Sequence, residues 1–320
     1  LAFMAFSTVW GFGNVINGFS EYGGLKAIVS WIMIFAIYFV PYALMVGELG
    51  SAFKNEGGGV SSWIHKTIGP RMAYYAGWTY WVVHMPYISQ KPNSTVIAAS
   101  WAIFQDNRAS SMNTTVMQLI CLVIFVVAMY LASKGIGVLK KLSTLAGSSM
   151  FIMSMLFIVM MTAAPVITDA QLLPIDWSLE TFMPTFDGNF FMSLSILVFA
   201  VGGCEKISPY VNKMKDPSKD FSRGMIALAI MVAVTAILGT ISLGMMFDSA
   251  NVPQDLMTNG AYYAFQKLGE YYHVGNLFVI IYALTNLIGQ FSVMVLSIDA
   301  PLRMLLDSAD EDYIPRRMFV

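Results

Sequence analysis

The chain has 320 residues, of which 57% are hydrophobic and only 12% are charged, and its formal net charge is −1. This composition lies far from that of soluble domains, so we exclude a soluble protein and expect an all-α integral membrane protein. The near-neutral charge gives no sign of a polyanionic partner, and we expect the lipid bilayer, not nucleic acid, as the surroundings.

Eight stretches with few or no charges predict membrane-spanning helices. Most of them exceed the roughly 20 residues that a helix needs to cross a bilayer. In chain order they cover residues 1–20, 27–47, 72–104, 115–132, 142–168, 190–204, 225–247 and 274–298. We number these predicted spans one to eight.

The first predicted span is interrupted by glycines at residues 11–13. A helix broken in hydrocarbon leaves backbone groups unpaired, which is tolerated only where they face protein or line a cavity. The freed N–H groups around Trp10, Gly11, Phe12 and Gly13, at the positive end of the following half-helix, would suit a carboxylate. The alternative is that these glycines only allow close helix packing.

Lys91 is a charged residue inside the third predicted span. It follows Arg71 by about 20 residues, which places it roughly 30 Å along the helix, in the outer half of a tilted span. It is a candidate for substrate recognition or ion coupling, although we favour snorkelling to the outer surface or a structural pairing. For the deeper His84 we expect a hydrogen-bonded packing role.

The chain divides at the polar stretch 169–189, the only plausible repeat boundary. We predict a first five-helix repeat over residues 1–168 and the start of a second repeat, with spans six to eight, over residues 190–320. Five spans is an odd number, so the second repeat would be inserted upside down, with its first helix again broken. The remaining spans of that repeat would lie beyond Val320, and we expect the chain to be a fragment.

The sixth predicted span is broken at residues 202–204. The carbonyl groups freed around Val201, Gly202, Gly203 and Cys204 would suit the ammonium group of an amino acid. Two broken helices in corresponding positions of two repeats point to the substrate site of a transporter.

Glu205 follows this second break directly. A carboxylate there is expensive to bury, so we predict a role in coupling or recognition. The alternative is a structural carboxylate that accepts hydrogen bonds from the broken helix. The adjacent Lys206 would hold Glu205 ionised, which argues against direct proton coupling through it.

The eighth predicted span carries Asn286, Gln290 and Ser297 near one helical face. We expect this face to point into the helix bundle. Asp299, close to the end of the span, is expected to be solvated or paired with Arg303.

Cationic residues predict the orientation, because Lys and Arg in short loops stay on the cytoplasmic side. The loops after the even-numbered spans carry fourteen of the eighteen Lys and Arg residues, with Lys206 counted among them. Odd-numbered spans therefore run outward and the N-terminal end is cytoplasmic.

At these residues the chain resembles the amino acid–polyamine–organocation superfamily of transporters. The matching stretches are FSTVWGFGN, PYALMVGELGSAFKNEGGGVSSWIHKTIGPRMAYYAGWTYW, ASKGIGVLKKL, FAVGGCEKISPYVNKMKDPSKDFSRG and DAPLRMLLDSADEDYIP. They touch most of the chain, and the loop with the triple glycine is the most specific. Within the superfamily the sequence is most similar to the bacterial glutamate/γ-aminobutyrate antiporter branch and related amino acid permeases.

This resemblance implies a 5+5 inverted-repeat fold with broken helices one and six, of which the chain would supply about eight of twelve spans. It implies alternating access to an amino acid, exchanged for a counter-substrate, across a bacterial plasma membrane. Phe199 aligns with the aromatic residue that closes over the substrate in relatives, although a Phe in a span more often packs or contacts lipid. The family carries out no chemistry, so we expect no enzyme, no catalytic residues, no cofactor and no metal site.

Several other functions stay open. One is a sodium- or proton-coupled symporter of amino acids or polyamines, since hydroxyls in the fifth span could help to coordinate sodium. A receptor or sensor with a transporter fold would need a signalling domain, which these 320 residues do not contain. A channel would need a ring-forming filter or a pore helix lined by like charges, and neither is present.

Overall fold

A computed structural model describes residues 1–214, 216–249, 251 and 253–307, and no strand occurs among them. The prediction of an all-α protein is confirmed. The longer helices are α4 (Val40–Ala52), α6 (Pro70–Phe104), α7 (Thr114–Ala132), α8 (Ile136–Ile167), α10 (Gly188–Val201), α11 (Pro217–Gly244), α12 (Leu256–Tyr271) and α13 (Leu277–Asp307). The shorter ones are α1 (Ala2–Val9), α2 (Phe12–Glu21), η1 (Gly24–Lys26), α3 (Ala27–Ile34), η2 (Phe35–Phe39), α5 (Val60–Thr67), η3 (Arg108–Ser111), α9 (Leu179–Phe182) and η4 (Cys204–Lys213).

Six helical segments in this described part are long and apolar enough to cross a membrane. They correspond to the second and fourth to eighth predicted spans, so the chain is a multi-pass membrane protein. The first predicted span, which is divided into α1 and α2, is not among the six. The third span forms α6, which at 35 residues is long enough, but polar and charged side chains such as His84 and Lys91 lie along it.

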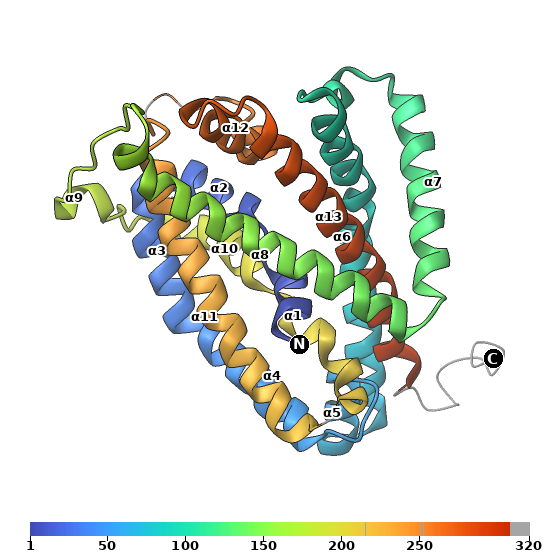
Figure 1. The fold of residues 1–320 in the computed structure, drawn as a ribbon. Coiled ribbons are helices and arrows are strands. Elements are labelled where there is room, and N and C mark those ends of the chain that lie inside the picture. The colour runs from blue at the N-terminus through green and yellow to red at the C-terminus, as the bar shows by residue number, and fades with distance from the viewer. Residues whose placement is uncertain (215, 250, 252, 308–320) are drawn as a thin grey trace.

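The broken helices lie in the middle of the bundle (Figure 1). On one side they are flanked by α3, α4 and α11, and on the other by α6 and α13, while α8 crosses between the two groups. We call the two ends of the molecule the α12 end and the α5 end. α2 contacts α12, and η4 contacts α5, so the half-helices point toward opposite ends.

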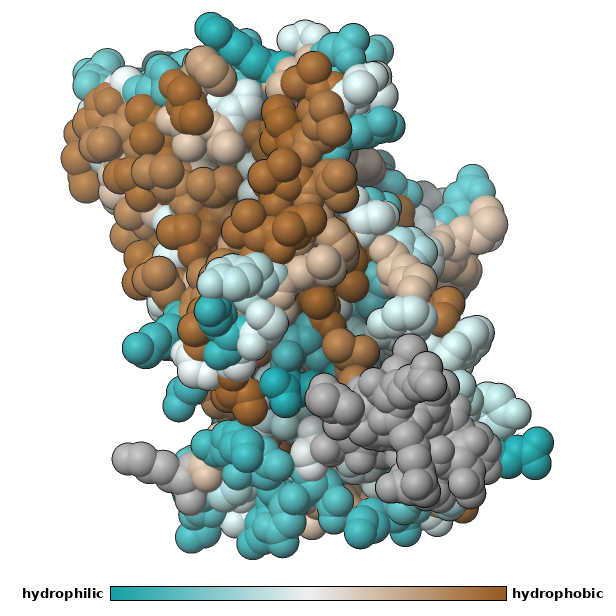
Figure 2. Space-filling model, turned by 90° about the vertical axis from the view of Figure 1, so that its right-hand side faces the viewer, coloured by the Kyte–Doolittle hydropathy of each residue, from teal (hydrophilic) through white to brown (hydrophobic). Residues whose placement is uncertain are grey.

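The outer face of α7 is apolar and exposed. Figure 2 looks at the side that carries α7 and shows hydrophobic surface over much of it, with hydrophilic residues toward both ends. The exposed apolar side chains of this helix include Val116, Leu119, Leu122, Val123, Val126 and Val127. A face of this kind suits contact with lipid or with other apolar surface.

At the α12 end, α6 and α12 are joined by an aromatic stack and a hydrogen-bonded amide. The rings of Trp101 and Tyr262 are parallel with centroids 4.9 Å apart. Asn259 accepts a hydrogen bond from the Trp101 indole at 3.0 Å and donates one to Asp255 at 2.8 Å. Hydrogen bonds from Tyr263 and Asn259 lower the pKa of Asp255, so its carboxylate stays ionised at neutral pH and holds the start of α12.

At the α5 end, one carboxylate joins η4 to α13. Asp299 accepts hydrogen bonds from Tyr210 and from the Arg303 guanidinium, both at 2.6 Å. The expected pairing of Asp299 with Arg303 is therefore confirmed, and Tyr210 is an additional partner. This cluster fixes the far end of η4 against α13.

We expect Asp299→Ala to destabilise the protein by about 2 kcal/mol, because two charge-assisted hydrogen bonds are lost and the Tyr210 hydroxyl is left buried. Thermal unfolding of the purified protein in detergent measures the change. Glu56→Gln is the matched control, since it breaks the Lys66–Glu56 pair, whose side chains are 51% and 34% exposed. That change should cost less than about 1 kcal/mol, and equal effects of the two variants would contradict the role of Asp299.

Candidate functional site

The first helix break is formed by two extended residues. α1 ends at Val9, Trp10 and Gly11 have β-region dihedral angles, and α2 begins at Phe12. The break is therefore shorter than the predicted residues 11–13, because Gly13 lies in the first turn of α2. The Asn14 N–H of that turn donates to the Gly11 carbonyl at 2.9 Å. The N–H groups of Phe12 and Gly13 have no carbonyl one turn earlier in the same helix, which leaves them free for an acceptor.

The second break lies between α10 and η4. α10 ends at Val201, Gly202 is extended, and Gly203 has φ of +107°. L-residues with a side chain rarely adopt this angle, so the chain needs glycine at this turn. η4 then continues the path as 3₁₀-helix from Cys204.

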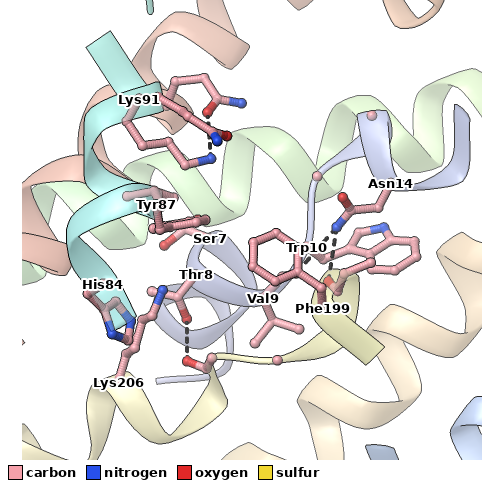
Figure 3. A pocket seen from close by; sticks show the side chains of 18 of the residues that line it. Ser7, Thr8, Val9, Trp10, Asn14, His84, Tyr87, Lys91, Phe199 and Lys206 are labelled. Atoms are coloured by element: carbon pink, nitrogen blue, oxygen red, sulfur yellow. Dashed lines mark hydrogen bonds between the residues drawn. The ribbon is translucent and has the colours of Figure 1, made fainter. Parts of the chain in front are cut away.

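Two side chains of the first broken helix tie the breaks together. Thr8 in α1 donates a hydrogen bond to the Gly203 carbonyl at 3.2 Å. Asn14 in α2 donates one to the Ala200 carbonyl at 3.1 Å, as Figure 3 shows. The Asn14 bond satisfies one carbonyl at the end of α10, so the other carbonyls freed there are open to a ligand. The Gly203 carbonyl belongs to the start of η4 and also accepts from the Lys206 N–H at 3.2 Å.

We expect Asn14→Ala to loosen this connection, because the Ala200 carbonyl loses its donor in a water-poor setting. The expected cost is about 1–2 kcal/mol in thermal stability, with a several-fold loss of transport. Asn14→Asp keeps the size but removes the donor, and should behave like alanine. Asn251→Ala, at an exposed position outside the helices, is the control and should change neither quantity.

Both breaks line one cavity of about 1360 Å³. Its wall comes from α1, α2, η2, α5, α6, α8, α10, η4, α12 and α13. Of the predicted site residues, those that line it are Trp10, Gly11, Gly13, Lys91, Phe199, Gly202, Gly203 and Glu205. Three others do not: Phe12, Val201 and Cys204 are buried away from it, at most 3% exposed. The Phe12 ring packs on Phe157 and Phe265.

Glu205 is held by two tyrosine hydroxyls. Tyr42 donates to one carboxylate oxygen at 2.7 Å and Tyr80 donates to the other at 2.5 Å. Tyr42 follows the π-helical stretch η2, and Tyr80 lies on α6, so this carboxylate connects three separate elements. With both oxygens engaged, Glu205 is less available as a partner for a cationic ligand.

Lys206 corrects our interpretation of the sequence, which counted it among the cytoplasmic loop cations beside Glu205. Its side chain is 5% exposed and lines the cavity, because the chain continues as η4 and does not leave the bundle after the break. Its ammonium lies over the Tyr87 ring, 4.3 Å from the centroid. No carboxylate, Glu205 included, lies within 4.0 Å of it among the described residues.

Lys91 also reaches the cavity and does not snorkel outward. Its ammonium lies 4.5 Å from the centroid of the same Tyr87 ring and donates to the Gln290 side-chain carbonyl at 3.2 Å. Figure 3 shows Lys91 on one side of Tyr87 and Lys206 on the other. Of our alternatives for Lys91, structural pairing therefore describes its contacts.

The polar residues of α13 extend this arrangement toward α12. The Gln290 amide donates to Asn286 at 3.2 Å, and Asn286 donates to the Tyr262 hydroxyl at 2.8 Å. Both amides line the cavity, as expected of an inward face, whereas the buried Ser297 does not. His84 donates from Nδ1 to the Tyr80 carbonyl, 2.7 Å away, in agreement with a hydrogen-bonded packing residue.

Phe199 lies at the open side of the cavity. Its side chain is 70% exposed, and its ring meets Tyr87 edge-on with centroids 6.0 Å apart. Its role as a gate stays a prediction.

The sequence analysis missed Tyr80 and Tyr87, although a signal for them was present. Tyr80, His84, Tyr87 and Lys91 are spaced by four, three and four residues, which places them on one face of a helix. Hydroxyl, imidazole and ammonium groups on one face of a membrane helix indicate a face toward a cavity.

Comparison with known proteins identifies the family of the chain. Residues 1–320 match a family whose description is "Amino acid permease". The chain is 52% identical to the aspartate/glutamate permease AcaP of Lactococcus lactis subsp. cremoris, over 98% of this chain and 65% of AcaP. It is 26% identical to the inner membrane transporter YjeM of Escherichia coli, over 73% of this chain and 48% of that protein.

A third relative is named "Probable agmatine/putrescine antiporter AguD", from Lactococcus lactis subsp. lactis. It is 24% identical over 67% of this chain and 44% of its own length. The chain thus spans slightly less than two thirds of AcaP and about half of the other two relatives.

Proposed function

Because the chain belongs to the amino acid permease family, we propose that it works as a secondary transporter of amino acids, with its substrate in the cavity between the helix breaks. Membership of the family confirms the resemblance to the amino acid–polyamine–organocation superfamily seen in the sequence. The observation that carries the proposal is that both breaks line the same cavity, with half-helices pointing to opposite ends.

The two breaks offer complementary partners to the two ends of an amino acid backbone. The first turn of α2 presents the N–H groups of Phe12 and Gly13 and a positive helix end, which suit the α-carboxylate. The end of α10 presents carbonyl groups around Gly202, which suit the α-ammonium group. We therefore place the backbone of the substrate between Gly11 and Gly202, beneath the exposed ring of Phe199.

We propose an acidic amino acid as the substrate. AcaP, at 52% identity, is named for aspartate and glutamate, whereas AguD, at 24%, is named for cationic amines. The cavity supports an acidic substrate, because Tyr42 and Tyr80 already engage the Glu205 carboxylate. Among the residues that the structure describes, no carboxylate lies within 4.0 Å of the Lys91 or Lys206 ammonium.

The transport cycle that we propose is alternating access across the plasma membrane. The inverted repeats at residues 1–168 and 190–320 would rock around the cavity, with the N-terminal end cytoplasmic. Residues 308–320, which we assigned to the start of the second repeat, lie outside the described residues. Exchange for a second amino acid is the first mechanism to test, with proton or sodium coupling as the alternative.

Flux measurements on the complete protein in liposomes test this function. We expect radiolabelled L-glutamate or L-aspartate to enter, and unlabelled amino acid inside the vesicles to accelerate entry if the protein exchanges. Repeating the assay with and without sodium and a pH gradient separates exchange from symport. Absence of flux of any amino acid under all four conditions would contradict the proposal.

A further inference from the structure

We propose that Lys206, Lys91 and the Tyr87 ring between them form the subsite for the side-chain carboxylate of the substrate, and so select acidic over neutral amino acids. This inference rests on the proposed function, since it assigns one part of the same cavity. It adds three residues that neither helix break supplies.

The first argument is charge. Two buried or half-buried ammonium groups line the cavity, and within the described part of the chain neither has a carboxylate within 4.0 Å. Glu205, the neighbour of Lys206 in sequence, directs its two oxygens to Tyr42 and Tyr80. An unpaired ammonium in low dielectric is costly, and an incoming anion would remove part of that cost.

The second argument is the place of the aromatic ring. Each ammonium lies within 4.5 Å of the Tyr87 centroid, and Figure 3 shows them on opposite sides of the ring. A tyrosine face attracts a cation, so the ring stabilises both lysines while it keeps the like charges apart. A ring face occupies only one direction around each nitrogen, so protons remain to bind an anion on both ammonium groups, although Lys91 also donates one to Gln290.

The third argument is that Lys91 is held in place from behind. The side chain of Gln290 accepts a hydrogen bond from Lys91 and donates one to Asn286. Asn286 in turn donates a hydrogen bond to the Tyr262 hydroxyl, so the donors of all three bonds follow one direction along the chain of groups. This order fixes the carbonyl oxygen of Gln290 toward the ammonium. Gln290 is thus a positioning residue for Lys91.

The subsite also lies at a suitable place relative to the breaks. Figure 3 shows Lys91 and Lys206 at the side of the cavity opposite Asn14, which marks the start of α2. An acidic amino acid whose backbone lies at the breaks would therefore extend its side chain toward α6 and the lysines. A neutral side chain in that position would leave both ammonium groups unpaired.

Lys206→Met is the variant that tests the subsite, because methionine keeps the unbranched stem and removes the charge. We expect the Kd of L-glutamate, measured by binding of radiolabelled glutamate to the purified complete protein, to rise roughly 10- to 100-fold. The Kd of L-glutamine, measured by competition, should stay the same or fall. Lys206→Arg keeps the charge and should retain a preference for glutamate over glutamine.

Lys213→Met is the matched control, since Lys213 lies on the same helix η4 but is exposed and outside the cavity. It should leave both constants unchanged. Gln290→Leu should weaken glutamate binding less than Lys206→Met does, and leave glutamine binding unaffected.

The outcomes separate this inference from the proposed function. Suppose that the wild-type protein binds amino acids, and that Lys206→Met raises the Kd of glutamate and of glutamine equally or changes neither Kd. The subsite is then wrong and the transporter proposal stands. If the wild-type protein binds no amino acid at all, the proposed function itself fails. A Lys206→Met protein that does not fold is recognised by thermal unfolding, and Lys91→Met with the same pair of ligands then decides the question by the same criterion.

Discussion

Replacing Glu205 with alanine is expected to reduce glutamate transport to below a tenth of the wild-type rate and to lower stability by about 3 kcal/mol. The carboxylate accepts hydrogen bonds from Tyr42 and Tyr80, and each charge-assisted bond contributes about 1.5–3 kcal/mol. Its removal leaves two buried hydroxyls unpaired and separates η4 from α4 and α6 at the second break. Uptake into liposomes and thermal unfolding in detergent measure the two effects.

Two further variants show which property of Glu205 matters. Glu205→Gln keeps an acceptor for one tyrosine, so it should fall between wild type and alanine in stability. If Glu205 also carries a coupling proton, the glutamine variant will lose the pH dependence of transport. Glu21→Gln, at an exposed carboxylate on α2, is the control. Wild-type transport by Glu205→Ala at every pH would remove this residue from the mechanism.

Replacing Gly203 with alanine is expected to have the second large effect. Gly203 has φ of +107°, and an added Cβ would lie 3.2 Å from the carbonyl oxygen of Thr8 across the gap between the breaks. The strained dihedral angle and the close contact both arise at the turn that separates the half-helices. Together they should lower the free energy of unfolding by about 1–3 kcal/mol. We expect at least a tenfold loss of transport, measured as initial uptake rate.

Gly137→Ala is the matched control for this substitution. An added Cβ at Gly137 meets nothing within 4 Å, and its φ lies in the ordinary range for a helix. Alanine is the better helix former there, so the variant should be as stable as wild type or slightly more so. Equal activity of Gly203→Ala and Gly137→Ala would mean that the turn at the second break tolerates a side chain, against this account.

The membrane helices and both breaks could be predicted because they depend on local sequence. Long apolar runs predict helices by themselves, and Gly11 and Gly203 mark the interruptions. The extent of the loops could not be predicted in the same way, because hydropathy does not distinguish a loop from a polar 3₁₀-helix that stays inside the bundle. For that reason Lys206 was counted as a loop cation, although it lies in the cavity.

The partners of the charged residues could not be predicted, because they come from distant parts of the chain. Tyr42 and Tyr80 reach Glu205 from 163 and 125 residues away. Lys91 and Gln290 meet across 199 residues. One sequence contains no direct information on such pairs, and only the helical spacing along α6 indicated that its polar face turns inward.

A structure of the complete protein with bound L-glutamate tests the central claim most directly. The account predicts density for one glutamate between the two breaks, with its α-carboxylate at the first turn of α2 and its side-chain carboxylate within 4 Å or so of the Lys206 ammonium, a salt-bridge distance. Glutamate bound elsewhere, or in this cavity with its side chain pointing away from Lys206, Tyr87 and Lys91, would contradict it.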